Sequence, residues 1–197
     1  MSGLITAERV EKRYGAAYGL RPVSFTLDRG GCLLVTGTNG SGKTTLLRVL
    51  AGLAAPTRGL LEVGVERGEL GYVGHDPLVY RELTGLENLE LYGRLYRVRE
   101  RRERIGMLLE RFGLWEARGR RVSSYSRGMT QRLALCRALL HDPTLLLLDE
   151  PFNALDGDGA ALLDRELGVL ARERTLVVST HDPDRVAPLA TERLALG

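Results

Sequence analysis

The sequence predicts an α/β protein with a largely parallel β-sheet. Short strand-like segments alternate with helical segments along much of the chain. A glycine-rich loop follows an apolar, strand-like run and leads directly into a helical one. Residues 79–140 differ, because their apolar residues recur with helical spacing. We therefore expect an α/β core that is interrupted by a helical insert of about 60 residues.

The core elements are predicted from local patterns. Residues 23–27 alternate between apolar and polar side chains, and residues 32–36 form a short apolar run. Residues 44–51 are predicted to be a helix that ends at a glycine. Strand character returns at residues 145–148 and at residues 176–179. Both ends of the chain are therefore expected to contribute to the core.

The helical insert is predicted to contain three amphipathic helices. Thr84 and Glu87 have the spacing of a capping box at a helix N-terminus. Three apolar stripes follow with helical spacing: Leu89, Leu91, Tyr92 and Leu95; Ile105, Leu108, Leu109 and Phe112; and Met129, Leu133, Cys136 and Leu140.

Composition places the chain among ordinary globular domains. It has 197 residues, of which 44% are apolar and 27% charged, so it can bury a sizeable core. These values exclude a disordered tail, a collagen-like rod and a disulfide scaffold. No apolar run approaches the ~20 residues of a membrane helix. The N-terminal residues carry charges where a secretory signal would be apolar. We expect a cytoplasmic protein that reaches a membrane only through a partner.

Charge and cysteine content give no sign of a nucleic-acid or metal site. The formal net charge is only +3, and the most basic stretch, residues 97–104, is interrupted by Glu100 and Glu103. That pattern favours a solvated helix face over a nucleic-acid surface. Cys32 and Cys136 match no metal or redox spacing. We expect both to be buried, reduced thiols.

A phosphate-binding loop is the strongest motif. Residues 37–44 match G-x-x-x-x-G-K-[ST] between an apolar strand and a helix. Glycines let backbone N–H groups converge on a phosphate, and the helix N-terminus adds partial positive charge. Lys43 would reach the β- and γ-phosphates and Thr44 would bind Mg²⁺. The alternative is a glycine-rich turn that merely precedes a helix. The candidate nucleotide-binding residues are Gly37, Thr38, Asn39, Gly40, Ser41, Gly42, Lys43, Thr44 and Thr45.

Two acidic residues follow a predicted buried strand a hundred residues later. Residues 145–148 are leucines, and Asp149 and Glu150 come directly after them. Asp149 would hold Mg²⁺ opposite Thr44 through the water shell of the ion. Glu150 would orient or deprotonate an attacking water. The alternative is that both acids simply end a core strand.

Four further segments give the chain a resemblance to the ATP-binding subunit of ABC transporters. Residues 124–132, Ser-Tyr-Ser-Arg-Gly-Met-Thr-Gln-Arg, resemble the family's signature segment. Residues 151–156 resemble the segment that holds the D-loop, and residues 179–182 resemble the segment of the switch histidine. Tyr14 matches the aromatic that stacks on adenine. The resemblance extends over residues 1–197.

The resemblance implies a fold and a domain organisation. It implies a single ABC ATP-binding domain over residues 1–197, with a P-loop NTPase core of the RecA-like type. The core lobe would comprise residues 1–78 and 141–197 approximately. The helical subdomain would comprise residues 79–140.

The resemblance also implies roles for individual residues. Two subunits would pack head to tail, so that Ser126, Arg127, Gly128 and Met129 of one face the γ-phosphate bound to the other. Asp156 would transmit the state of one site to the second. His181 would bind the γ-phosphate and orient the water beside Glu150. Without the family, His181 could be a polar residue at a strand end and Tyr14 an aromatic residue at the rim of a site.

The chain departs from the family pattern at several positions. Arg127 and Met129 replace a glycine and the glutamine of the usual signature, and Asn153 stands where a serine is common. His75 occupies the position of the Mg²⁺-linked glutamine. Imidazole is a poor ligand for Mg²⁺. Either His75 acts through water, or Asp76 substitutes for it, or the metal contact is weak.

The function implied is Mg²⁺-dependent ATP hydrolysis that drives a separate transmembrane permease. The protein would be a homodimer or pseudo-dimer, bound peripherally at the cytoplasmic face of the membrane, with residues 75–80 and the helical insert as the dock. The Gly-His-Asp-Pro segment at residues 74–77 resembles heme exporters of cytochrome c maturation, whereas residues 125–129 resemble small multidrug exporters. Rival functions are a soluble ABC ATPase acting on nucleic acid or ribosomes, and a small-molecule kinase.

Overall fold

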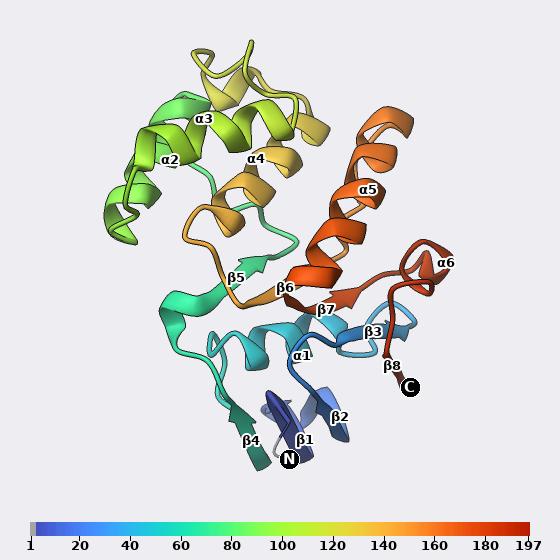
Figure 1. Cartoon of the computed structure of the whole chain (residues 1–197). Coiled ribbons are helices and arrows are strands. Elements are labelled where there is room, and N and C mark those ends of the chain that lie inside the picture. The colour runs from blue at the N-terminus through green and yellow to red at the C-terminus, as the bar shows by residue number, and fades with distance from the viewer. Residues whose placement is uncertain (1–2) are drawn as a thin grey trace.

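The computed structural model describes residues 3–197 and contains a parallel sheet at its centre (Figure 1). Five strands follow the order β5-β6-β7-β3-β8, and every neighbouring pair is parallel. The strands are β3 (Cys32–Gly37), β5 (Leu70–Val73), β6 (Leu145–Asp149), β7 (Thr175–Ser179) and β8 (Glu192–Leu196). The predicted α/β class with a largely parallel sheet is confirmed.

A second sheet of three antiparallel strands was not anticipated from the sequence. Its order is β2-β1-β4, with β1 at Ile5–Tyr14, β2 at Ala17–Leu27 and β4 at Arg58–Val63. Within these three segments, the sequence pattern predicts a strand only at residues 23–27. Three register shifts interrupt the β1–β2 ladder. Such shifts break the strict alternation from which strands are predicted.

Residues 3–197 contain six α-helices, and three of them lie in the segment predicted to be helical. These three are α2 (Gly85–Leu95), α3 (Arg101–Arg111) and α4 (Arg127–Leu139). Thr84 Oγ1 accepts from the N–H of Glu87 at 3.1 Å, and Glu87 Oε2 accepts from the N–H of Thr84 at 2.8 Å. The predicted capping box is therefore present. The other helices are α1 (Lys43–Leu50), α5 (Gly157–Glu173) and α6 (Pro183–Val186), and two 3₁₀ turns lie at Arg67–Glu69 and Val122–Ser124.

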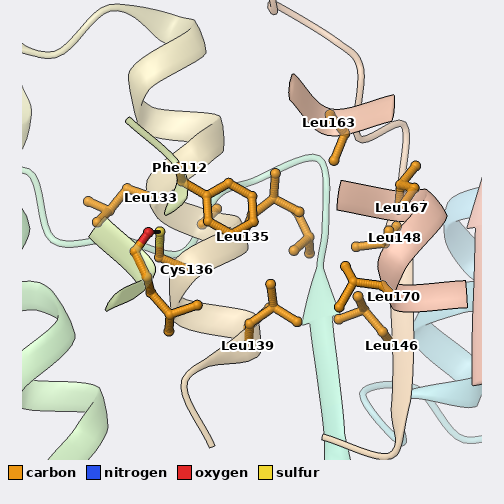
Figure 2. Close-up of a cluster of buried hydrophobic side chains, with 14 of the residues drawn as sticks. Phe112, Leu133, Leu135, Cys136, Leu139, Leu146, Leu148, Leu163, Leu167 and Leu170 are labelled. Atoms are coloured by element: carbon orange, nitrogen blue, oxygen red, sulfur yellow. Dashed lines mark hydrogen bonds between the residues drawn. The ribbon is translucent and has the colours of Figure 1, made fainter. Parts of the chain in front are cut away.

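Strand β6 is buried on both faces and separates two hydrophobic cores. Leu145 and Leu147 belong to the core in which α1 lies between the two sheets. Leu146 and Leu148 belong to the other core, where they pack with side chains of α4 and α5 such as Leu139 and Leu170 (Figure 2). Successive side chains of a strand point to opposite faces, so a strand covered on both sides is apolar throughout. This explains the run of four leucines.

The helical segment contributes its predicted stripes to the second core. Phe112 and Leu133 are fully buried there beside Cys136 (Figure 2). Leu91 and Leu95 of α2 are exceptions, since neither belongs to this core and Leu95, the last residue of the helix, is 66% exposed. None of the helices in residues 3–197 combines the length and hydropathy needed to cross a membrane.

Both cysteines are free and buried, as predicted. Burial raises the pKa of the Cys32 thiol to about 11 and also raises the pKa of Cys136. A raised thiol pKa keeps the reactive thiolate scarce until the pH approaches that value. The fold itself thus protects both thiols from modification.

At pH 8, we expect the two cysteine thiols of the native protein to react with a thiol reagent only as fast as the protein unfolds. In denaturant, both thiols should react at once. The measurement is the rate of modification against urea concentration, with free cysteine as the reference. Rapid modification of either residue without denaturant would show that the thiol is accessible.

Candidate nucleotide-binding site

A cleft of about 740 Å³ collects most of the residues predicted to bind nucleotide. It lies beyond the carboxyl ends of β3, β6 and β7, where parallel α/β sheets bind ligands. Its lining residues are Tyr14, Gly19, Thr38, Asn39, Gly40, Gly42, Lys43, Thr44, Thr45, His75, Glu150, Asn153 and His181. Segments far apart in the sequence are therefore brought together here.

The backbone of the loop between β3 and α1 requires glycine. Gly37, Gly40 and Gly42 have φ values of 150°, 85° and 106°. A Cβ on Gly42 would also lie 2.7 Å from the carbonyl oxygen of Gly19. Helix α1 begins at the next residue and has no side-chain cap. Its first N–H groups are therefore free to bind an anion.

Lys43 lies folded over this loop. Its side chain is almost fully buried, and Nζ donates to the carbonyl oxygens of Gly37 at 2.8 Å and Thr38 at 3.4 Å. Nζ also lies 3.7 Å from Oε1 of Glu150. A buried ammonium ion beside bare N–H groups makes this end of the cleft electropositive, which suits a polyphosphate.

The donor set at Asp149 fits a hard cation such as Mg²⁺. Asp149 is 1% exposed, and its Oδ1 accepts from Ser179 Oγ at 2.6 Å. Its Oδ2 is buried and has no hydrogen-bond partner within residues 3–197. An unpaired buried carboxylate oxygen is costly unless a ligand uses it. Residues 3–197 contain no cluster of three His, Cys, Asp or Glu side chains, and Mg²⁺ needs only one or two protein ligands beside substrate phosphates.

Glu150 is held in a strained conformation beside His181. Its φ is 50°, and its N–H donates to the carbonyl oxygen of Ser179 at 3.0 Å. Its Oε2 accepts from the backbone N–H of His181 at 3.1 Å and lies 2.7 Å from His181 Nδ1. Because an ionised carboxylate only accepts hydrogen bonds, Nδ1 would be the donor in this contact when Glu150 is ionised. Left-handed backbone at a non-glycine residue costs about 1–3 kcal/mol and is concentrated at functional sites.

Tyr14 and His75 both line the cleft. Tyr14 is 53% exposed, and Lys12 Nζ lies 5.3 Å from its ring centroid. A Cβ on Gly19 would lie 2.6 Å from Tyr14 Cε2, so the ring rests against bare backbone of β2. Sequence reasoning missed Gly19, although a lone glycine in a strand signals such a close approach. His75 is exposed and lines both this cleft and a second cavity.

The second cavity, of about 900 Å³, separates the core from the start of α4. It shares Glu150 and Asn153 with the first cleft and extends to Arg127 and Thr130. Its other lining residues are Gly74, His75, Asp76, Pro77, Val79, Arg81, Val122, Tyr125, Gln131, Asp149 and Ala154.

The signature-like segment and Asp156 lie away from the nucleotide cleft of their own chain. Ser126 Oγ accepts from the N–H of Met129 at 3.1 Å and so caps α4. Ser126 and Arg127 are exposed, and none of Ser126, Arg127, Gly128 or Met129 lines the first cleft. Asp156 Oδ1 accepts from the N–H of Gly159 at 2.8 Å and caps α5.

The loop geometry leads to a testable comparison of two glycines. Gly42→Ala should lower the free energy of unfolding by about 2–4 kcal/mol, since it adds a backbone clash to the cost of a left-handed conformation. Gly40→Ala is the matched control, because a Cβ there meets no atom within 4 Å, and it should cost about 1–2 kcal/mol. Urea denaturation followed by circular dichroism measures both. Equal losses would mean that the Gly19 carbonyl does not restrict position 42.

Comparison with known proteins agrees with this geometry. The family model described as ABC transporter matches residues 20–153. The daunorubicin resistance ATP-binding protein DrrA3 of Streptomyces coeruleorubidus is 40% identical over 198 residues, covering 94% of this chain and 63% of that protein. The bacitracin transport ATP-binding protein BcrA of Bacillus licheniformis is 35% identical over 192 residues, covering 92% of this chain and 62% of that protein. The chain thus spans less than two thirds of the length of these curated relatives.

Solved structures show the same cassette. The dimeric, post-hydrolysis structure of the ATP-binding cassette MJ0796, bound to ADP and Pi, has a TM-score of 0.88 and 28% identity. The match covers 98% of this chain and 94% of that one. With a family model over most of its length, the same cassette fold and a matching phosphate loop, the chain belongs to the ABC transporter family and carries its ATPase domain.

Proposed function

We propose that the chain is the ATP-hydrolysing subunit of an ABC transporter, and that it dimerises around two ATP molecules to drive a separate membrane permease. The observation that carries the proposal is the convergence of the phosphate loop, Lys43 and the Glu150–His181 pair on one cleft. Each of these groups has a distinct task in hydrolysis.

Nucleotide binding would use the loop and the rim of the cleft. The bare N–H groups at the start of α1 and the ammonium of Lys43 would bind the phosphates. Lys43 Nζ donates to two carbonyl oxygens and lies 3.7 Å from Oε1 of Glu150, and a phosphate would be a stronger acceptor than a carbonyl oxygen. Tyr14, which is 53% exposed, would stack on the adenine.

The metal ion would be held by Asp149 and Thr44. Mg²⁺, when bound, supplies positive charge that offsets the charge of the phosphate oxygens. Support comes from the unpaired Oδ2 of Asp149 and from the place of Thr44 in the lining of the cleft. His75 lies at the junction of both cavities, where it would act through water rather than as a direct ligand.

Hydrolysis would depend on Glu150. Its carboxylate would orient or deprotonate a water that attacks the γ-phosphorus, while the bond to the β-γ bridging oxygen breaks and ADP leaves. His181 holds that carboxylate through its backbone N–H and Nδ1, and in the imidazolium form its Nε2–H would also donate to the γ-phosphate. The pair would thus align base, water and phosphate.

A second copy would complete each site. The start of α4 presents the Ser126 hydroxyl and the N–H groups of the first turn, yet this surface does not line the chain's own cleft. Like the start of α1, the start of α4 carries a partial positive charge that favours an anion. Its N–H groups would therefore donate to the γ-phosphate bound to a partner copy. Asp156, at the start of α5, would connect the two sites.

Replacing the proposed base should separate binding from hydrolysis. Glu150→Gln should lower kcat for ATP by about 100-fold or more while nucleotide still binds. With ATP, the variant should elute as a dimer in size-exclusion chromatography. Glu173→Gln, at an exposed position at the end of α5, is the matched control and should behave as wild type. Near-normal turnover by Glu150→Gln would remove Glu150 from this role, and absence of ATP-dependent dimers would favour a kinase.

The cargo class is proposed from the relatives. DrrA3 and BcrA are named for daunorubicin resistance and bacitracin transport, which supports a small exporter of the drug or antibiotic type. The expectation of heme export rested on the short segment around His75, and neither relative supports it. Export of a compound of the drug or antibiotic type is therefore our proposal, with the chain bound peripherally to its permease at the cytoplasmic face of the membrane.

The permease would dock beside the second cavity. Leu78, Tyr80 and Leu86 are 44%, 53% and 38% exposed, respectively, although all three are large apolar residues. They lie between the end of β5 and the first turn of α2, next to the rim formed by Pro77 and Val79. Contiguous exposed apolar residues are typical of protein–protein interfaces. A permease helix docked there would transmit movement of the helical segment to the rest of the permease.

This surface can be tested by purification from native membranes. Tyr80→Glu and Leu86→Glu should each abolish co-purification of a multi-helix membrane protein in mild detergent while leaving ATP binding unchanged. Leu60→Glu is the control, because Leu60 is 68% exposed on β4 of the other sheet. Recovery of ribosomes or nucleic acid in place of a membrane protein would contradict the transport proposal and favour the soluble ABC ATPase.

A further inference from the structure

Ser179, the last residue of β7, contacts both acidic residues of the site. It is paired in register with Asp149 on the neighbouring strand β6 and is fully buried. Its Oγ donates to Asp149 Oδ1 at 2.6 Å and accepts from the N–H of Glu150 at 3.2 Å. Its carbonyl oxygen accepts from the same N–H at 3.0 Å. One residue outside the loops thus touches both carboxylate-bearing positions.

The contact with Asp149 determines which oxygen faces a ligand. A carboxylate with one oxygen bonded to a fixed hydroxyl cannot rotate freely about its Cβ–Cγ bond. Ser179 Oγ is restrained in turn, because it is buried and also accepts from the N–H of Glu150. Oδ2 is left as the unpaired oxygen. Residues that orient a metal ligand in this way commonly change metal affinity 10- to 100-fold when mutated.

The contact with Glu150 supports a strained backbone. Glu150 has a φ of 50°, and its N–H has two acceptors on Ser179. The backbone acceptor remains when the side chain is removed. Loss of the hydroxyl should therefore affect Asp149 more than Glu150.

We propose that Ser179 is a positioning residue that orients the Asp149 carboxylate for the metal ion bound with the nucleotide. The proposal rests on the proposed ATPase function. It predicts that the hydroxyl of Ser179 tunes metal affinity, whereas a purely structural hydroxyl would affect only stability.

The chain offers a matched control on the same strand. Thr175, the first residue of β7, is equally buried, and its hydroxyl accepts from the N–H of Gly30 at 2.9 Å, away from the site. Ser179→Ala and Thr175→Val each remove one buried hydroxyl from β7. Only the first removes a contact with Asp149.

The experiment measures Mn²⁺ binding to the protein with ADP by the loss of the free-Mn²⁺ EPR signal, and the Mg²⁺ dependence of ATP hydrolysis. Ser179→Ala should weaken Mn²⁺ binding and raise the half-saturating Mg²⁺ concentration by about 10-fold or more. ADP affinity in EDTA should stay within about twofold of wild type, and kcat at saturating Mg²⁺ should fall less than in Glu150→Gln. Thr175→Val should keep the metal affinity of wild type.

Wild-type metal affinity in Ser179→Ala, or the same change in Thr175→Val, would overturn the proposal. Should Ser179→Ala fail to fold, Ser179→Cys tests the same contact with a weaker donor and should show a smaller shift in the same direction. A wild-type chain that binds neither nucleotide nor Mn²⁺ with ADP would instead overturn the proposed function, and this proposal with it.

Discussion

The burial of β6 on both faces is the constraint on which the rest of this structure depends. Its four leucines alternate between two cores, one with α1 and one with α4 and α5. A strand held in this way cannot shift its register without exposing apolar surface. Asp149 and Glu150 are therefore carried to the carboxyl edge of the sheet at defined positions. There β3 delivers the phosphate loop and β7 delivers Ser179 and His181.

The site contains buried groups of opposite charge that lie close together. Lys43 is almost fully buried and close to Glu150, while the buried Asp149 has one oxygen bonded to Ser179 and one unpaired. Buried charges are costly unless a partner or ligand compensates them. Strands β6 and β7, which carry Asp149 and Ser179, are buried at every residue and so hold this arrangement rigidly. A polyphosphate with a divalent cation would satisfy both the bare N–H groups and the unpaired carboxylate oxygen.

One chain contains only part of the arrangement that the family resemblance implies. Tyr14, the phosphate loop, His75, Glu150 and His181 share a cleft, whereas Ser126 and Asp156 use their oxygens to cap α4 and α5. Those helix starts present partial positive charge outside the cleft. The second cavity is lined by residues of the core and of α4.

The sequence by itself determined the α/β class, the phosphate loop, the capping box at Thr84 and the buried strand before Asp149, because each depends on residues close together in the chain. Tertiary structure alone decided the antiparallel sheet, whose register shifts hide its period, and the contact of Gly19 with Tyr14. It also decided that Ser179 bonds Asp149 across 30 residues of sequence. Contacts of this kind arise from strand order and register, and these follow from how β6 packs between two cores rather than from any local pattern.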